Sequence, residues 1–256
     1  NRGLRYGDGL FETMRIDNGK ILNEAFHFDR LYQGLALLQL KAANFFTSDF
    51  VLQKVKDLLK KNGDLSNARV RLMAFRGNGE LFSVDDNTMN YMLECWPLNE
   101  PIKLNSNGLI INVFSDARKA CDGFSNLKSN NYLPFVMGAI YAKKNQLNDA
   151  IILNSFNRIC ESIIANIFII KDDVIYTPPL SEGCVAGTVR RKIVEQKSIS
   201  NLPVEEKGLT IEDVLDADEF FLTNAIHPIR WVKNFREKNY GNEKISGIFN
   251  FLLEKL

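Results

Sequence analysis

The stretch that decides the fold spans residues 161–191 and reads ESIIANIFIIKDDVIYTPPLSEGCVAGTVRR. It contains the apolar run SIIANIFII, a turn at residues 171–173 and a second short strand, VIYT. The loop SEGCVAG then leads into TVRRKIVEQ, which we expect to be a helix. Short strands rich in isoleucine and valine, followed by a helix, indicate a mixed α/β (α+β) fold.

Glu161 stands at the start of the apolar run, where a carboxylate beside a buried strand costs free energy unless it has a partner. A protonated pyridine nitrogen is one such partner. A carboxylate that keeps this nitrogen charged makes the ring of a cofactor an electron sink. A salt bridge at the end of a strand is the alternative that the same residue allows.

Gly183 and Gly187 precede the predicted helix, so backbone N–H groups at its N-terminus face one point. The helix dipole adds partial positive charge, which makes this turn a candidate anion site. The glycine spacing is not that of a Walker loop, and glycine before a helix is common, so the pattern alone does not identify the anion. Arg30, on the first predicted helix, would add a bidentate charge to a phosphate.

Lys128 lies between an apolar strand at residues 109–114 and a helix that we expect to end at Gln146. Its neighbours in SNLKSNNY are small or amide residues. Schiff-base chemistry needs an amine that is partly neutral near neutral pH, and burial or a nearby cation lowers the pKa of a lysine toward that range. Since most lysines are solvated, the case for Lys128 depends on what surrounds it.

Composition and charge exclude several classes of function. The 256 residues include 32 Lys plus Arg and 31 Asp plus Glu, spread along the chain, which leaves no basic stripe for nucleic acid. No apolar run is long enough to cross a bilayer, and the polar start NRGLRYGDG is not a signal peptide. We therefore expect a cytoplasmic protein that binds neither nucleic acid nor membrane.

Cysteine and histidine usage argues against metal chemistry. The 4 cysteines stand singly, without a Cys-x-x-Cys pair, which disfavours both a disulfide framework and a thiolate metal site. His27 and His227 are too few for a His-rich metal site. We expect no metal, and we assign covalent and proton-transfer steps to lysine, carboxylates, tyrosine or an organic cofactor.

The predicted elements divide the chain into two domains. Residues 1–97 form an α+β domain, the polar stretch 98–107 is a linker, and residues 108–256 form the second domain. In the first domain we expect a hairpin from strands 4–16 and 20–23, a helix at residues 28–40, and a second helix that Ser48 caps and that stops at Gly63. Strands 68–77 and 88–96 follow. In the second we expect strands 150–154, 163–170, 174–177 and 219–223, a short helix capped by Thr210 and a C-terminal amphipathic helix.

Taken in order, the segments RYGDGLFET, HFDRL, LKSNNYL, the block at residues 161–191 and LTNA resemble the class IV aminotransferases, the fold type IV pyridoxal-phosphate enzymes. This family includes branched-chain aminotransferases, D-amino acid aminotransferases and 4-amino-4-deoxychorismate lyases. The resemblance covers nearly the whole chain. It implies bound pyridoxal 5'-phosphate, a homodimer, a small α+β N-terminal domain and a larger C-terminal domain with a pseudo-barrel of short strands. It also implies a strand or two upstream of residue 1, which we expect this chain to lack.

The resemblance assigns roles to individual residues. Lys128 matches the lysine that forms the aldimine and moves the proton between substrate and cofactor, and Glu161 matches the partner of the pyridine nitrogen. Arg30 matches the phosphate-binding arginine, Tyr132 lies near the position of a residue beside the ring hydroxyl, and Asn166 matches a structural asparagine. The two phosphate-binding loops correspond to Gly187, Thr188 and Val189, and to Asn224 and Ala225.

The shared machinery does not choose the reaction, because all members remove a proton activated by the cofactor ring. The segments FETMR and TNA stand where branched-chain aminotransferases usually show FEGIR and GTA, which favours the lyase. The strand TMNYMLECW, however, lacks the arginine that the lyases tend to present to the substrate carboxylate, which favours an aminotransferase.

We therefore rank first an aminotransferase that passes an amino group between a small amino acid and a 2-oxo acid. Arg76 is its predicted substrate ligand, chosen from the strand arginines Arg69, Arg71 and Arg76. A lyase that releases pyruvate from aminodeoxychorismate to give 4-aminobenzoate is the alternative. A cofactor-binding protein without turnover is a third hypothesis, against which the intact Lys128 and Glu161 argue.

Overall fold

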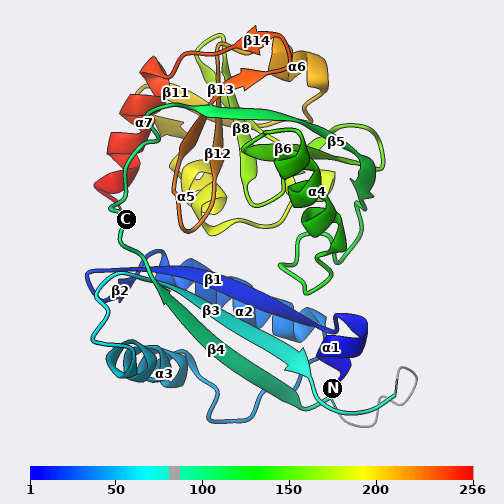
Figure 1. The fold of residues 1–256 in the computed structure, drawn as a ribbon, viewed down its shortest axis with the longest axis vertical. Coiled ribbons are helices and arrows are strands. Elements are labelled where there is room, and N and C mark those ends of the chain that lie inside the picture. The colour runs from blue at the N-terminus through cyan, green and yellow to red at the C-terminus, as the bar shows by residue number, and fades with distance from the viewer. Residues whose placement is uncertain (81–86, 256) are drawn as a thin grey trace. The chain divides into compact units, whose positions relative to one another are not determined.

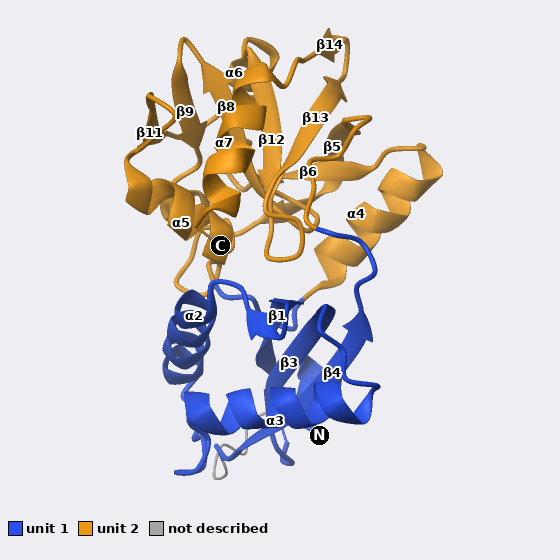
Figure 2. Ribbon diagram, turned by 90° about the vertical axis from the view of Figure 1, so that its left-hand side faces the viewer, with its two compact units in different colours: residues 1–101, 127–131 blue, residues 102–126, 132–256 orange. Residues whose placement is uncertain are grey.

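The computed structural model describes residues 1–80 and 87–255, and the chain falls into two compact units (Figure 2). Unit 1 comprises residues 1–101 and 127–131, and unit 2 comprises residues 102–126 and 132 to the C-terminus. The division after residue 101 falls within the predicted linker. The sequence did not predict that residues 127–131 belong with the first unit.

Unit 1 is built on a four-stranded antiparallel sheet in the order β2-β1-β3-β4, with α2 and α3 packed on one face (Figure 1). Because side chains alternate along a strand, Met14, Val70 and Leu72 point to this face, where they share a core with Leu31 of α2 and Val55 of α3. The elements are α1 (Arg2–Tyr6), β1 (Gly9–Asp17), β2 (Lys20–Ile21), α2 (Glu24–Leu37), α3 (Ser48–Lys61), β3 (Ala68–Arg76) and β4 (Met89–Pro97).

The predicted hairpin is confirmed, but its first strand begins later than expected. Asn18 and Gly19 form a two-residue turn, and both have positive φ (47° and 75°), which matches the twist of the two strands. Residues 2–6 are helical and not part of the strand, which starts at Gly9. The side chain of Asn1 caps this helical turn, a local contact that the strand prediction did not include.

The predicted helix after residue 47 is confirmed as α3, with a different cap. Thr47 Oγ1 accepts a hydrogen bond from Phe50 N at 3.2 Å, so Ser48, the predicted cap, is the first helical residue. Both hydroxyl residues suit an N-cap, and composition therefore does not place this boundary to one residue. Thr210 caps α6 as predicted, in a capping box with Asp213.

Unit 2 contains a mixed sheet in the order β10-β11-β9-β8-β12-β13-β5-β6-β7, with β14 paired to β13. Central strands alternate between two cores: Ile167 and Phe220 face one, and Phe168 and Phe221 face the other, which α5 and α7 cover. This confirms the predicted mixed α/β class.

The strands are β5 (Leu109–Lys119), β6 (Asp149–Asn154), β7 (Ile159–Ser162), β8 (Asn166–Lys171), β9 (Val174–Thr177), β10 (Ser198–Ile199), β11 (Leu202–Glu206), β12 (Glu219–Thr223), β13 (Arg230–Phe235) and β14 (Lys238–Asn239). The helices are α4 (Leu133–Lys144), the 3-10 turn η1 (Leu180–Glu182), α5 (Thr188–Gln196), α6 (Ile211–Leu215) and α7 (Glu243–Leu253).

The deciding stretch, residues 161–191, is partly as predicted. The strand predicted at residues 163–170 starts later than expected, because β7 ends at Ser162 and β8 begins only at Asn166. Ser162 N donates to the carbonyl of Ala165 at 2.8 Å, which closes the turn between them. Glu161 therefore lies inside β7 and not ahead of a strand. The strand β9 and the helix α5 are confirmed with the predicted bounds.

Two longer strands, β11 and β13, were not predicted. β11 reads LPVEE and β13 reads RWVKNF, so each places charged residues in a short run, and β11 also contains a proline. Their parallel partners, β9 and β5, lie far from them in the sequence. Pairing, and not local propensity, makes these segments strands.

Candidate functional site

Glu161 is the centre of a charged cluster inside unit 2. Its side chain comes from β7, and the residue is 3% exposed. One carboxylate oxygen, Oε1, accepts a hydrogen bond from Lys119 Nζ at 2.8 Å, and Oε2 accepts one from the backbone N–H of Val185 at 2.9 Å. The salt bridge that the sequence left open as an alternative is therefore present. Its cation, Lys119, was not predicted.

Lys119 reaches this carboxylate from the end of β5, after an irregularity in the strand. The register of β5 against β6 shifts between Phe114 and Arg118. Burial lowers the pKa of Lys119, but the Glu161 carboxylate outweighs burial, so the pKa lies above the ordinary lysine value. Lys119 therefore stays a cation, and a protonated amine is a poor nucleophile.

The loop SEGCVAG keeps its shape through Asn126. The Asn126 side chain donates hydrogen bonds to the carbonyls of Leu180 at 2.8 Å and of Cys184 at 2.7 Å. Gly183 has a φ of +86°, a conformation that other residues rarely adopt, and this completes the turn. These contacts fix the loop beside the carboxylate of Glu161.

Asn166, at the start of β8, fixes the end of the same loop. Its Nδ2 donates to the carbonyl of Val185 at 2.8 Å. Gly187 packs so closely against Asn166 Oδ1 that a Cβ atom would overlap this oxygen. Only glycine allows this approach, and the contacts of Asn166 agree with the structural role that the resemblance implies.

Two buried hydroxyls without hydrogen-bond partners lie near the N-terminus of α5. Thr188 Oγ1 and Thr223 Oγ1 are buried, and no described residue hydrogen-bonds to either. Thr223 is the strand partner of Asn166, whose side chain touches Gly187, so the end of β12 meets the start of α5 here. Gly187 offers no side chain to cap the first turn of α5. Unpaired buried donors at a helix N-terminus fit an anion such as a phosphate group. Val189 packs its side chain into the core and contributes only backbone here.

The second predicted phosphate loop follows β12. Asn224 Oδ1 accepts hydrogen bonds from the backbone N–H groups of Ile226 at 2.9 Å and His227 at 2.8 Å. Asn224 therefore shapes the loop with its side chain. The backbone N–H of Ala225 takes part in no hydrogen bond within the described residues, so it is the group that this loop can offer to a phosphate.

In unit 1, Arg30 belongs to a buried ion cluster. Its Nε and Nη2 donate to the two carboxylate oxygens of Glu12 at 2.8 and 2.5 Å, and His27 Nδ1 lies 2.6 Å from the same carboxylate. Burial raises the pKa of Glu12, but Arg30 and His27 outweigh burial and lower the pKa to about 2. The sequence did not predict Glu12 or His27. The spacing of His27 and Arg30, three residues apart on one helix face, was the available signal.

Lys128 lies in the segment 127–131, which pairs with β1 of unit 1. Phe11 N donates to the carbonyl of Lys128 at 2.9 Å. Lys128 Nζ lies 4.6 Å from the centre of the Phe11 ring, and the guanidinium carbon of Arg71 lies 4.2 Å from the same centre. The predicted Schiff-base lysine and an arginine thus share one aromatic ring.

Arg76, the predicted substrate ligand, uses its guanidinium inside unit 1. Nε donates to Asp8 at 2.8 Å, Nη1 to the Asn87 side chain at 2.5 Å, and Nη2 to the carbonyl of Leu38 at 2.6 Å. Arg71 differs, because its Nε is buried and no described residue accepts a hydrogen bond from it. Of the strand arginines Arg69, Arg71 and Arg76, Arg71 is therefore the one with a buried donor that has no acceptor among the described residues.

Tyr132 occupies the N-cap position of α4, and its ring centre lies 4.5 Å from that of Phe135. The predicted site residues are thus divided between the units. Unit 2 holds Glu161, Tyr132, Gly187, Thr188, Val189, Asn224 and Ala225, and unit 1 holds Lys128, Arg30 and Arg76.

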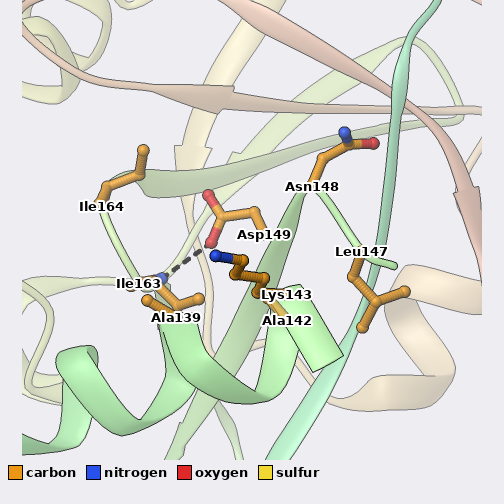
Figure 3. Close-up of a pocket in the computed structure, with 8 residues that line it drawn as sticks. All are labelled: Ala139, Ala142, Lys143, Leu147, Asn148, Asp149, Ile163 and Ile164. Atoms are coloured by element: carbon orange, nitrogen blue, oxygen red, sulfur yellow. Dashed lines mark hydrogen bonds between the residues drawn. The ribbon is translucent and has the colours of Figure 1, made fainter. Parts of the chain in front are cut away.

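A pocket of about 300 Å³ lies elsewhere in unit 2, lined by α4, residues 147–149 and residues 163–164 (Figure 3). It contains none of the predicted site residues. Asp149 lines it, accepts hydrogen bonds from Ser162 Oγ at 3.0 Å and Ile163 N at 3.1 Å, and has a pKa that burial raises to about 6.

Within the described residues, no group of three or more His, Cys, Asp and Glu side chains is arranged to hold a metal ion. No helix in residues 1–80 and 87–255 combines the length and apolar composition that a membrane crossing requires.

Comparison with known proteins identifies relatives along the whole chain. The family model described as "Amino-transferase class IV" matches residues 9–235. A putative branched-chain-amino-acid aminotransferase from Methanocaldococcus jannaschii is 29% identical over 256 residues, which cover 100% of this chain and 88% of the relative. The aminodeoxychorismate lyase from Bacillus subtilis is 30% identical over 252 residues, which cover 95% of this chain and 83% of the relative. The crystal structure of a putative 4-amino-4-deoxychorismate lyase from Legionella pneumophila has a TM-score of 0.88 at 23% identity, covering 99% of this chain and 92% of that one, and it shares the fold.

Proposed function

The chain belongs to the class IV aminotransferase family, and from this membership we propose that it passes an amino group between an amino acid and a 2-oxo acid. Members of the family depend on pyridoxal 5'-phosphate, so the protein is a pyridoxal-phosphate-dependent enzyme. Similarity alone leaves the reaction open, because the relatives at 29% and 30% identity bear the names of an aminotransferase and of a lyase.

The observation that supports amino transfer is the position of Arg71 relative to Lys128. Both side chains approach the ring of Phe11, at 4.2 and 4.6 Å, and Arg71 Nε is buried without an acceptor among the described residues. An amino acid presents one α-carboxylate to the enzyme, whereas aminodeoxychorismate presents two carboxylates. One guanidinium with a buried Nε–H near the proposed reacting amine matches one carboxylate. We therefore propose Arg71, in place of Arg76, as the substrate ligand.

The other predicted residues have separate roles in this proposal. Lys128 would hold the cofactor through its amine and move the proton at the α-carbon of the substrate. Glu161 would accept the hydrogen bond of the protonated pyridine nitrogen. Thr188 and the first-turn N–H groups of α5 would hold the phosphate, with the loop at residues 224–225 and with Arg30. When bound, pyridoxal phosphate supplies a sink for the electrons left at the α-carbon.

We also propose that the enzyme is a homodimer that uses α4. Leu133, Val136, Met137 and Ile140 recur at helical spacing and form a stripe whose members are 71%, 49%, 46% and 56% exposed in the single chain. The opposite side of α4 packs into the core of unit 2 through Phe135. A helix that is apolar on both sides is typical of one that an assembly buries. A second copy of the chain would cover this stripe.

The reaction is tested by supplying the purified enzyme with pyridoxal phosphate and a panel of L- and D-amino acids with 2-oxo acid acceptors, and in parallel with aminodeoxychorismate. We expect transamination of at least one common amino acid, with a kcat/KM above that for pyruvate release. Arg71→Ala should lower this kcat/KM about tenfold to hundredfold, because a charge-assisted hydrogen bond contributes roughly 1.5 to 3 kcal/mol.

Two variants serve as controls for this experiment. Arg69→Ala removes another arginine of β3, whose guanidinium lies over the Trp96 ring, and should change kcat/KM little. Lys128→Ala should abolish both turnover and the visible absorbance of the bound cofactor while the circular dichroism spectrum stays the same. Efficient formation of 4-aminobenzoate without transamination would reverse the ranking in favour of the lyase. Equal kcat/KM for Arg71→Ala and the wild type would remove Arg71 from the site.

A further inference from the structure

Lys119 is a largely buried cation to which the proposed function gives no role. We propose that Lys119 is a positioning residue, which keeps the Glu161 carboxylate ionised and oriented toward the protonated nitrogen of the cofactor ring. This inference depends on the role proposed for Glu161, and it deepens that role. All the residues that carry it belong to unit 2.

The ammonium group of Lys119 has a fixed position. It donates hydrogen bonds to Glu161 Oε1 at 2.8 Å and to the carbonyl of Ser125 at 2.9 Å. The side chains of Lys119 and Glu161 are only 12% and 4% exposed. Ser125 is held by a turn in which the Asp122 carboxylate accepts hydrogen bonds from Ser125 Oγ at 2.7 Å and Phe124 N at 2.9 Å. A lysine anchored at two points in this way orients its carboxylate partner.

The Glu161 carboxylate keeps acceptor capacity for another donor. A carboxylate offers about four lone-pair positions on its two oxygens. Here Lys119 uses one position on Oε1, and the backbone N–H of Val185 uses one on Oε2. The two contacts together fix the plane of the carboxylate. The remaining positions can accept a hydrogen bond from a ring nitrogen.

Lys119 also determines which partner carries the proton. In a buried site, a carboxylic acid beside a neutral nitrogen competes with the ion pair, because burial disfavours charge. Lys119 Nζ is 2.8 Å from Glu161 Oε1. A ring nitrogen that used another lone pair of the carboxylate would lie farther from Nζ than this oxygen does, since two cationic donors repel. Coulomb energy falls with distance, so Lys119 stabilises the carboxylate more than it destabilises the ring cation. In the bound cofactor, the proton would therefore stay on the ring nitrogen.

Among the described residues, no neighbouring group can replace Lys119 in this role. The titratable and charged groups around the pair are Cys121, Asp122, Cys160, Cys184 and Arg190. Burial raises the pKa of the Cys160 thiol and raises that of Cys184 to about 12, so both stay neutral. Asp122 is an anion, since a side-chain hydrogen bond holds its pKa below the ordinary value. Arg190 is paired with Glu206.

Replacement of Lys119 in the holoenzyme tests the inference. Lys119→Met removes the charge and keeps an apolar stem of similar length, and Lys119→Gln keeps a hydrogen-bond donor without the charge. In both variants the Kd of the apo-protein for pyridoxal phosphate should rise about tenfold to hundredfold. The visible absorbance of the bound cofactor should also change at a lower pH than in the wild type, because the ring nitrogen loses its proton more easily. Lys119→Arg should restore most of both properties.

The controls separate positioning from simple stabilisation. Arg158→Met removes a different ion pair of unit 2, Arg158–Glu182 at 2.7 Å, and should leave the absorbance titration and the Kd unchanged. If Lys119→Met lowers the melting temperature but leaves both cofactor properties as in the wild type, the ion pair is only structural and the inference is wrong. If Lys119→Met does not fold, the same two cofactor properties are compared between Lys119→Gln and the wild type. Lys119→Arg then tests whether a positive charge at this position restores them.

One further variant separates this inference from the proposed function. Glu161→Gln should itself shift the absorbance titration if Glu161 holds the ring nitrogen. A shift with Glu161→Gln and none with either uncharged Lys119 variant would reject the role of Lys119 alone. No shift with Glu161→Gln would reject the proposed role of Glu161.

Discussion

Gly187 lies where the loop before α5 approaches β8. The neighbouring atoms leave no room for a side chain on its Cα. A Cβ there would overlap Asn166 Oδ1. The Asn166 side chain cannot move away cheaply, because its Nδ2 holds the Val185 carbonyl at 2.8 Å. The next residue, Thr188, begins the turn that we propose for the phosphate. The methyl group of an alanine at position 187 would therefore change the shape of this loop, and through it the candidate site.

Gly187→Ala should raise the Kd for pyridoxal phosphate at least about tenfold while the chain still folds, because the φ of −65° at this position suits alanine and only the contact fails. Titration of the apo-protein with the cofactor measures this change. Gly241→Ala is the matched control, since nothing lies within 4 Å of its added Cβ. Equal affinity of Gly187→Ala and the wild type would show that the loop does not bind the phosphate.

The sequence indicated some residues of the candidate site and not others, for a physical reason. Glu161 and Gly187 stand out in the sequence because a carboxylate beside an apolar run and a glycine before a helix are local features. Lys119 lies 42 residues from Glu161, and Glu12 lies 18 residues from Arg30. Their ion pairs form only after the strands and helices have assembled, so no local pattern indicates them.

Among the elements, α5 was predicted with the observed bounds because the loop glycine and the apolar spacing agree. The strand predicted at residues 163–170 begins only at Asn166, because residues 163–165 form a turn that contains no glycine or proline. The turn exists because Ile163 N donates to the carbonyl of Ala150 in β6, a contact that the local sequence does not contain. The packing of the single chain likewise does not explain the exposed apolar stripe on α4.

Ile140→Glu should convert the proposed homodimer into a monomer. Ile140 is 56% exposed in the single chain, so a glutamate there should alter the stability of the monomer by no more than about 0.5 kcal/mol. In a dimer that covers the stripe, the same glutamate would be a buried charge without a partner, which costs several kcal/mol. Light scattering coupled to size-exclusion chromatography measures the change in mass.

The control for this prediction places a glutamate on another exposed apolar residue. Phe156, in the turn between β6 and β7, is 61% exposed, and Phe156→Glu should leave the oligomeric state unchanged. A wild-type protein that is monomeric at micromolar concentration would contradict the homodimer. A dimer that tolerates Ile140→Glu would place the interface on another surface.

At the scale of the molecule, the sequence predicted the fold class but not the course of the chain between the units. The segment 127–131 leaves unit 2 and joins unit 1, where Phe11 N binds the Lys128 carbonyl at 2.9 Å. This pairing joins residues more than a hundred positions apart. Hydrophobic periodicity reports the faces of single elements and does not report such partners.

The buried carboxyl group of Asp149 should make the free energy of unfolding of the protein depend on pH. Burial raises the pKa of Asp149 from 3.8 to about 6, although hydrogen bonds from Ala150 N and Ser162 Oγ act in the opposite direction. The folded protein therefore binds a proton more tightly at this site than the unfolded chain does. The stability that the protonated group contributes is present below the unfolded pKa and is lost as pH rises through the folded pKa.

Asp149→Asn should remove this part of the pH dependence. The asparagine oxygen can accept from Ala150 N and Ile163 N as Asp149 Oδ1 does, and its amide can donate to Ser162 Oγ, so the neutral form of the site is preserved. At about 1.4 kcal/mol for each pKa unit, and because pH ~4 already lies just above the unfolded pKa, the variant should gain roughly 2.5 kcal/mol relative to the wild type between pH ~4 and pH ~7.5. Urea unfolding at both pH values measures this gain.

Asp216→Asn, at an aspartate whose side chain is 68% exposed, is the control, and it should differ from the wild type by a similar amount at both pH values. If Asp149→Asn gained no stability relative to the wild type as pH rose, Asp149 would be ionised in the folded protein at low pH, and the effect of its burial would be smaller than its hydrogen bonds.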